Sequence, residues 1–117
     1  MVKQSENAMI VDTLIEGIIH NPDRLKAYES TSNKILFIVK WNKAEKRHNL
    51  CLPVYTVEDE LIGFIRKEVE KIKELFTEYS DPVALLIDRT HRYVFIDLYF
   101  SHDKEYLEEL RKRTYKK

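Results

Sequence analysis

The chain has 117 residues, of which 44% are hydrophobic and 34% are charged, and its 20 basic and 20 acidic side chains give a formal net charge of zero. The length suffices for a buried core without disulfides or metals, and the composition excludes an intrinsically disordered chain. The balanced charge excludes a strong overall attraction to nucleic acid or an anionic membrane, so such a partner would have to meet a local patch. We expect a single domain over residues 1–117.

The single cysteine, Cys51, excludes an internal disulfide and indicates a reducing compartment. Charged residues interrupt the N-terminal segment, and no apolar run is long enough for a secretory or membrane-spanning segment. We therefore expect a cytoplasmic protein that does not enter a membrane. The abundance of Glu and Lys relative to Gln is typical of a thermophilic source.

Residues 8–29 are expected to form an N-terminal helical segment. Its apolar residues recur at the spacing of one helix face: Val11, Leu14, Ile15 and Ile18. This pattern predicts a helix over residues 9–20. The helix should end at Asn21, because the residue before a proline leaves the helical region, and Pro22 can then begin a second short helix.

Four strands are predicted, at residues 35–41 and 48–55 and as a hairpin within residues 83–100. Pro53 cannot donate a ladder hydrogen bond, so its strand is expected at a sheet edge. A long helix is predicted from Thr56, as a helix cap, to about Tyr79, because apolar residues follow one helix face from Leu61 onward. A last helix is predicted over residues 103–113.

These elements give the order α-ββ-α-ββ-α and an α+β fold: a two-layer sandwich with a four-stranded antiparallel sheet and helices mainly on one face. With the predicted strands numbered along the chain, the order 2-1-3-4 places Pro53 at an edge. The order 1-2-4-3 would need a bulge there. Residues 34–79 and 82–114 share one plan, which suggests a ββα repeat.

A carboxylate, Asp97, stands in the middle of the last apolar strand. A hairpin tip centred on Thr90 and His91 would place residue 84 opposite 97, 86 opposite 95 and 88 opposite 93. The core face would then hold Val83, Leu85, Ile87, Val94, Ile96, Leu98 and Phe100, and the opposite face Ala84, Leu86, Asp88, Tyr93, Phe95, Asp97 and Tyr99. The opposite face is too apolar to stay bare, so a partner subunit, the N-terminal helix or a ligand should cover it.

Basic residues gather beside aromatic rings at the two predicted hairpin tips. They are Lys43, Lys46 and Arg47 near Trp41, and Arg89 and Arg92 near Tyr93. Cations beside an aromatic ring can bind phosphates and stack on bases. We therefore expect a homodimeric binding domain without catalytic activity that contacts nucleic acid through these five cations. Pairing is expected through the edge of the last strand or through an interface of Tyr93, Phe95, Asp97 and Tyr99.

No cofactor or metal is expected, because the only glycines are Gly17 and Gly63 and the four histidines lack the spacing of a metal pair. An alternative hypothesis is a metal-dependent nuclease that uses Asp88 and Asp97, with Glu16 as a further acid. The segment from Asp88 to Asp97-Leu98-Tyr99 resembles part of the PD-(D/E)xK nuclease pattern, although Tyr99 stands where that pattern has lysine.

The element order also resembles that of LAGLIDADG homing endonucleases, type III secretion chaperones and roadblock-type dimers. Leu14-Ile15-Glu16-Gly17 is similar to part of the LAGLIDADG helix, without its second acid and final glycine. This likeness concerns four residues and does not assign the chain to a family. A third hypothesis is therefore a chaperone or adaptor for a protein partner.

Overall fold

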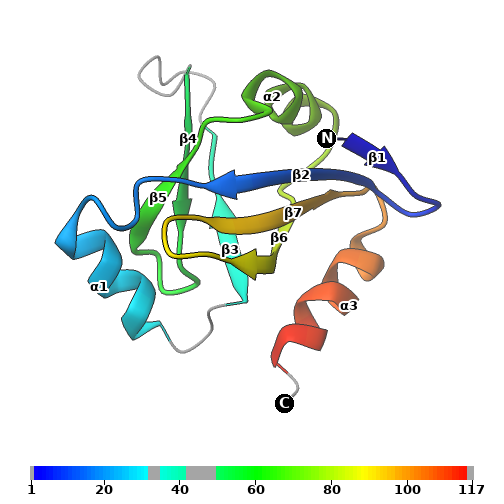
Figure 1. Cartoon of the computed structure of the whole chain (residues 1–117). Coiled ribbons are helices and arrows are strands. Elements are labelled where there is room, and N and C mark those ends of the chain that lie inside the picture. Colours follow the sequence, from blue (N-terminus) through cyan, green and yellow to red (C-terminus); the bar gives the residue numbers. More distant parts are fainter. Residues whose placement is uncertain (1, 32–34, 42–49, 116–117) are drawn as a thin grey trace.

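The computed structural model describes residues 2–31, 35–41 and 50–115. In chain order its elements are β1 (Val2–Gln4), β2 (Met9–Ile15), α1 (Pro22–Ser30), β3 (Leu36–Val39), β4 (Leu52–Tyr55), β5 (Leu61–Ile65), α2 (Val69–Glu78), β6 (Val83–Arg89), β7 (Val94–Phe100) and α3 (Lys104–Tyr115). The strands form one sheet in the order β1-β2-β7-β6-β3-β4-β5, and every neighbouring pair is antiparallel. The sheet curls into a half-barrel (Figure 1).

The two ends of the curl meet where the chain leaves β2. Glu16 and Phe64 exchange two backbone hydrogen bonds, of 2.7 and 2.9 Å, which join this point to β5. Gly63 allows the approach, because a Cβ at this position would lie 2.5 Å from the carbonyl oxygen of Glu16 and 2.7 Å from Cγ2 of Ile15. Any larger residue would push the strands apart.

The main core lies inside the curl. Inward-facing strand residues meet the apolar face of α2 there, and the buried set includes Val11, Ile15, Val54, Ile65, Ile72, Ile96, Leu98 and Phe100. Ala27 of α1 is also buried in this core. By contrast, α3 packs on the outer face of the sheet, where Leu107 and Leu110 contact Leu36 and Val83. The helices therefore lie on both sides of the sheet.

The predicted two-layer sandwich with a four-stranded sheet is wrong, since the sheet has seven strands among the described residues. Two segments predicted as helices, residues 9–15 and 61–65, are the strands β2 and β5. The second of them separates the β3–β4 hairpin from α2, so residues 34–79 and 82–114 differ in element order. The four predicted strands are neighbours within the larger sheet, in the order β4-β3-β6-β7, and the mixed α+β class remains.

The segment 9–15 is a strand because its buried residues alternate. Val11, Thr13 and Ile15 are buried, and the residues between them are partly exposed. Hydrophobicity alone does not reveal this alternation, because the inward-facing residue Thr13 is polar. Its hydroxyl donates a 2.8 Å hydrogen bond to the carbonyl of Lys67. Without Thr13, the remaining apolar residues fit a helix equally well.

The predicted long helix fails at its start because Thr56 closes a turn instead of capping a helix. Its hydroxyl accepts a hydrogen bond from the N–H of Glu60, and its own N–H donates to the Glu60 carbonyl at 2.9 Å. Asp59 has a positive φ of 67°, which is incompatible with a helix interior. The chain therefore reverses into β5, and α2 begins only after Glu68, another residue with positive φ.

The predicted register of the β6–β7 hairpin is also wrong. Ala84 lies opposite Leu98, and Leu86 lies opposite Ile96, so the pairing is shifted by one residue. A bulge at Ile87 then places Asp88 opposite Phe95. The β7 half of the predicted core face is buried as expected. In β6, Val83 of that face is also buried, but it packs against α3 on the outer side of the sheet, whereas Ala84 is buried in the main core and Ile87 is 53% exposed.

Candidate functional site

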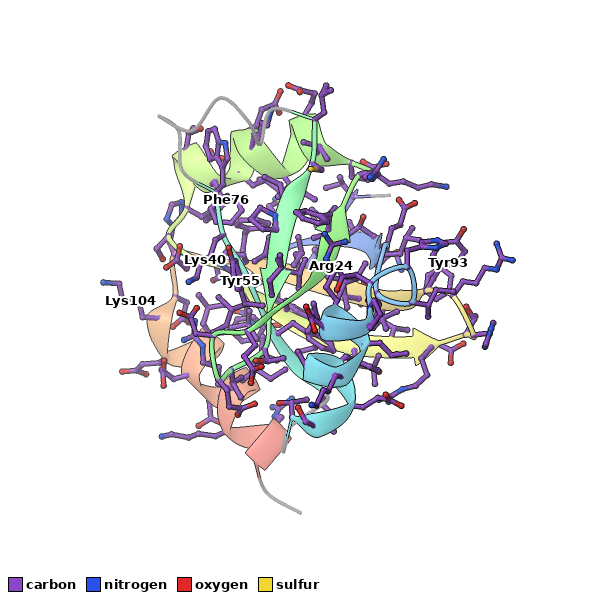
Figure 2. All side chains as sticks on the ribbon, turned by 90° about the vertical axis from the view of Figure 1, so that its left-hand side faces the viewer. Arg24, Lys40, Tyr55, Phe76, Tyr93 and Lys104 are labelled. Carbon is purple, nitrogen blue, oxygen red and sulfur yellow. The ribbon has the colours of Figure 1, made fainter. Side chains whose placement is uncertain are left out.

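The β6–β7 tip, residues 90–93, is an exposed turn with two cations and an aromatic ring. The Thr90 hydroxyl accepts hydrogen bonds from the N–H groups of Arg92 and Tyr93, and the Thr90 N–H donates to the Tyr93 carbonyl at 2.8 Å. These bonds fix the backbone while the side chains stay in solvent, with Tyr93 37% exposed. Tyr93 stands at the outer end of the hairpin, on the side of the molecule that carries α1 (Figure 2).

The tip joins α1 in one surface. The Arg89 guanidinium carbon lies 5.7 Å from the centre of the Tyr28 ring, which in turn stacks on Phe37. Burial raises the pKa of Tyr28, opposed by the positive charge of Arg89. A shallow hollow of about 70 Å³ is lined by Tyr28 and by residues 89–94. We call this the tip surface and define it by Tyr28, Arg89, His91, Arg92 and Tyr93.

The other predicted cations, Lys43, Lys46 and Arg47, lie outside the described residues. Trp41, the aromatic residue predicted to accompany them, packs against Phe76 with ring centres 6.0 Å apart. Because β3 and β6 are antiparallel, Trp41 and Arg89 lie toward opposite ends of this strand pair. The Trp41 and Arg89 regions therefore do not form one continuous patch within a subunit.

Asp97 lies beside Asp12 and not beside Asp88. It faces outward from β7, directly opposite Asp12 of β2 on one side and Leu85 of β6 on the other. Asp88 is exposed beyond the bulge and accepts a hydrogen bond from the N–H of Arg89. Glu16 lies four residues beyond Asp12, at the β5 junction. Among the described residues, no group of three or more His, Cys, Asp or Glu side chains could hold a metal ion.

The Asp12 and Asp97 carboxyls are hydrogen-bonded to each other, and this contact shifts their pKa values in opposite directions. Burial raises the pKa of Asp97 to about 7, and the hydrogen bond with Asp12 and its negative charge act in the same direction. The same hydrogen bond lowers the pKa of Asp12, whose carboxylate also lies 3.6 Å from the Lys3 ammonium of β1. Below about pH 7, protonated Asp97 therefore donates a hydrogen bond to ionised Asp12, because two adjacent carboxylates resist joint ionisation.

The sequence prediction missed Asp12, since a helix over residues 9–20 would place it on the solvated side. The signal was present in the alternation of Ile10, Asp12 and Leu14 with buried residues. With this segment as a strand, Asp12 lies beside Asp97 because the two residues are directly paired across β2 and β7. The other oxygen of Asp97, Oδ1, is buried and has no hydrogen-bond partner among the described residues.

The expected pairing through the edge of the last strand is wrong, because β7 is hydrogen-bonded to β2 and β6 on its two sides. Of the predicted interface residues, Phe95, Asp97 and Tyr99 lie on the outer face of β7 and are partly exposed. Tyr99 packs beside Tyr106 of α3. Tyr93 belongs to the tip and precedes the strand.

Comparisons with protein-family models, with characterised proteins and with solved structures gave no match. None of the helices in the described part of the chain is long and apolar enough to cross a membrane.

Proposed function

We propose that this protein is a non-catalytic binding domain that contacts nucleic acid through the tip surface. The observation that carries the proposal is the placement of Arg89 over Tyr28, which joins the exposed hairpin tip to α1 in a surface with two arginines and an exposed tyrosine. Guanidinium groups form charge-assisted hydrogen bonds with phosphate oxygens, and exposed aromatic rings stack on unpaired bases. A single-stranded nucleic acid offers both partners.

The charges around the tip surface determine how strongly we expect it to bind nucleic acid. Acidic residues stand next to members of the tip surface in the chain: Asp88 precedes Arg89 on β6, and Glu29 follows Tyr28 on α1. They offset part of the attraction from Arg89 and Arg92, and the chain as a whole is neutral. We therefore expect weak binding that falls steeply with salt, with a dissociation constant of about 10–100 μM at low ionic strength.

The test is a comparison of two charge reversals by fluorescence anisotropy with a labelled single-stranded oligonucleotide. Arg92→Glu removes a tip cation and should weaken binding by about tenfold, since each phosphate contact contributes to counterion release. Lys104→Glu is the matched control, because Lys104 is an exposed cation on α3. Equal effects of both changes, binding that does not respond to salt, or no binding at about 50 mM salt would each contradict the proposal.

We also propose that the chain is a homodimer. The support is the outer face of β2 and β7, where Ile10, Leu14 and Phe95 remain partly exposed next to Ile87. A second copy would cover this apolar area. Light scattering at tens of micromolar should then give twice 14.1 kDa, and a mass of 14.1 kDa would contradict the dimer. The proposed compartment, the cytoplasm, rests on the single cysteine.

A further inference from the structure

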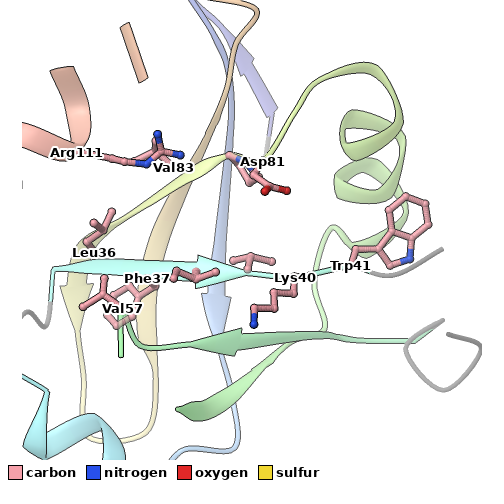
Figure 3. A pocket seen from close by; sticks show the side chains of 11 residues that line it. Leu36, Phe37, Lys40, Trp41, Val57, Asp81, Val83 and Arg111 are labelled. Carbon is pink, nitrogen blue, oxygen red and sulfur yellow. The ribbon is translucent and has the colours of Figure 1, made fainter. Parts of the chain in front are cut away.

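A cleft of about 640 Å³ opens between β3 and the residues that lead into β6 (Figure 3). Its walls include Leu36, Phe37, Val57 and Val83, with Trp41 at one end and the charged residues Lys40, Asp81 and Arg111 at the rim. The volume falls in the range of ligand-binding clefts, about 300–1,000 Å³. The cleft lies at the start of β6, whereas the tip surface lies at its end.

The cleft exists because pairing between β3 and β6 stops early. The two strands pair at Leu36 and Phe37, and the N–H of Leu86 donates to the carbonyl of Ile35. Continued by two residues, this register would place Val39 opposite Pro82. Proline has no N–H to donate, and no backbone hydrogen bond joins Val39 to Pro82 in the described part of the chain.

The backbone of β3 is therefore open toward the cleft. Backbone groups alternate between the two edges of a strand. Ile35 bonds toward β6 and Lys40 bonds toward β4, where its N–H donates to the Pro53 carbonyl. The alternation directs the N–H and C=O of Val39 toward the cleft.

We propose that an extended peptide segment binds in this cleft as an added strand, antiparallel to β3, and pairs with the backbone of Val39. Strand addition of this kind takes its affinity from main-chain hydrogen bonds and its specificity from alternate side chains. It is independent of nucleic-acid binding at the tip surface, and it gives structural content to the hypothesis of a protein partner.

The walls define the chemistry of the peptide. The side chain opposite Val39 would face the inner side of the sheet, where Phe37 and Val39 are buried, and should be apolar. The next residue, opposite Lys40, would face outward, toward Lys40 and Arg111, and should be acidic, whereas the place opposite Ile38 is taken by Val83 of β6. Lys40 and Arg111 already pair with Asp59 and Glu108 at 2.6 Å, but these ion pairs are solvent-exposed and are easily exchanged for others.

The experiment uses the full chain and the capped peptide acetyl-Glu-Val-Glu-Val-Glu-amide, which alternates acidic and apolar residues. Binding is followed by ¹⁵N NMR at the Val39 amide and by the fluorescence of Trp41, the only tryptophan in the chain. We expect a saturable shift of the Val39 resonance and slower exchange of its N–H. Methylation of both valine nitrogens in the peptide should weaken binding by about tenfold, because it removes the strand donors.

A matched pair of variants tests the charged rim. Arg111→Glu should weaken binding of the acidic peptide by about fivefold, while Arg113→Glu, an exposed change on the same helix, should leave it unchanged. A peptide with lysine in place of glutamate should bind more weakly than the acidic one. Equal binding of the methylated peptide would overturn strand addition. So would Val39 protection that rises with protein concentration alone, since a second copy would then occupy the edge.

Discussion

Two junctions of the sheet differ: the end of β2 is joined to β5 by hydrogen bonds, which we call the closed seam, whereas β3 and the start of β6 are separated by a cleft, which we call the open seam. One residue explains the difference at each junction. At the closed seam, Gly63 lets β5 approach the end of β2, and Glu16 and Phe64 exchange two hydrogen bonds. At the open seam, Pro82 removes the donor that Val39 would need, and β3 separates from β6. The lack of a Cβ at Gly63 allows the half-barrel to close, and the lack of an N–H at Pro82 leaves a cleft in it.

The closed seam should therefore contribute mainly to stability, and the open seam mainly to binding. The closed seam is lined by fully buried residues such as Ile15 and Ile65, so its integrity should matter for folding. The open seam leaves backbone groups directed toward a cleft of about 640 Å³, so it is available for a partner. Substitutions at the two seams should therefore differ in kind as well as in size.

The largest effect is expected from Gly63→Ala. The added Cβ would lie 2.5 Å from a backbone carbonyl oxygen, which cannot move without displacing β2. We expect a loss of about 3 kcal/mol in the free energy of unfolding, measured by urea denaturation. The control is Gly17→Ala, which is strained by a φ of +82° but meets only the flexible end of Arg24, at 3.3 Å. It should lose about 1 kcal/mol. Equal losses for Gly63→Ala and Gly17→Ala would contradict the claim that the close approach of β5 to β2 requires glycine at position 63.

A pH-dependent effect is expected from Asp97→Asn, beside the strand that carries the closed seam. The pKa of Asp97 is raised from 3.8 to about 7, so the folded state binds the extra proton between those values. The stability that this carboxyl contributes therefore falls as pH rises from about 4 to 7. Asparagine cannot ionise, and the variant should be more stable than the wild type at pH 8 by about 2 kcal/mol, a value reduced for solvent screening.

Thermal unfolding of the wild type and the variant at pH 5 and pH 8 checks this expectation. About a third of the difference between the two proteins should be present at pH 5, and the whole of it at pH 8. Asp88→Asn serves as the control, since Asp88 is exposed and accepts a hydrogen bond from the adjacent N–H of Arg89. An Asp97→Asn difference that is the same at both pH values would show that the pKa of Asp97 is not raised in the folded protein.

The smallest effect on stability is expected from Pro82→Ala. The change supplies an N–H opposite Val39 and allows the β3–β6 ladder to extend, while the buried proline ring is lost. These terms oppose each other, so the free energy of unfolding should change by no more than about 1 kcal/mol. Peptide binding in the cleft should weaken, because the added pairing competes for Val39. Unchanged binding would place the peptide elsewhere.

The sequence indicated those elements whose signals are local. Pro22 begins α1 with Asn21 as its cap, and the Asn21 side chain accepts hydrogen bonds from two backbone N–H groups. The β6–β7 hairpin follows from two apolar runs around a polar tip, and its β7 half alternates in burial. These patterns depend on residues within one element, so periodicity and proline preferences are sufficient to find them.

The errors arose where distant residues decide the structure. Thr13 faces the core because Lys67 accepts its hydrogen bond, 54 residues along the chain. Gly63 is required by the backbone of Glu16, and the bulge at Ile87 moves the β6 side chains to the other face. The Asp12–Asp97 pair forms only if residues 9–15 are a strand, so predicting a helix there prevented its recognition. None of these contacts has a signature within its own segment.

Amide hydrogen exchange in the wild-type protein tests the contrast between the seams most directly. The N–H groups of Glu16 and Phe64 are bonded across the closed seam and should exchange slowly. The N–H of Val39 faces the cleft and should exchange much faster, even though the Val39 side chain is only 3% exposed. Protection of Val39 equal to that of Phe64 would contradict the open seam and the binding site proposed there.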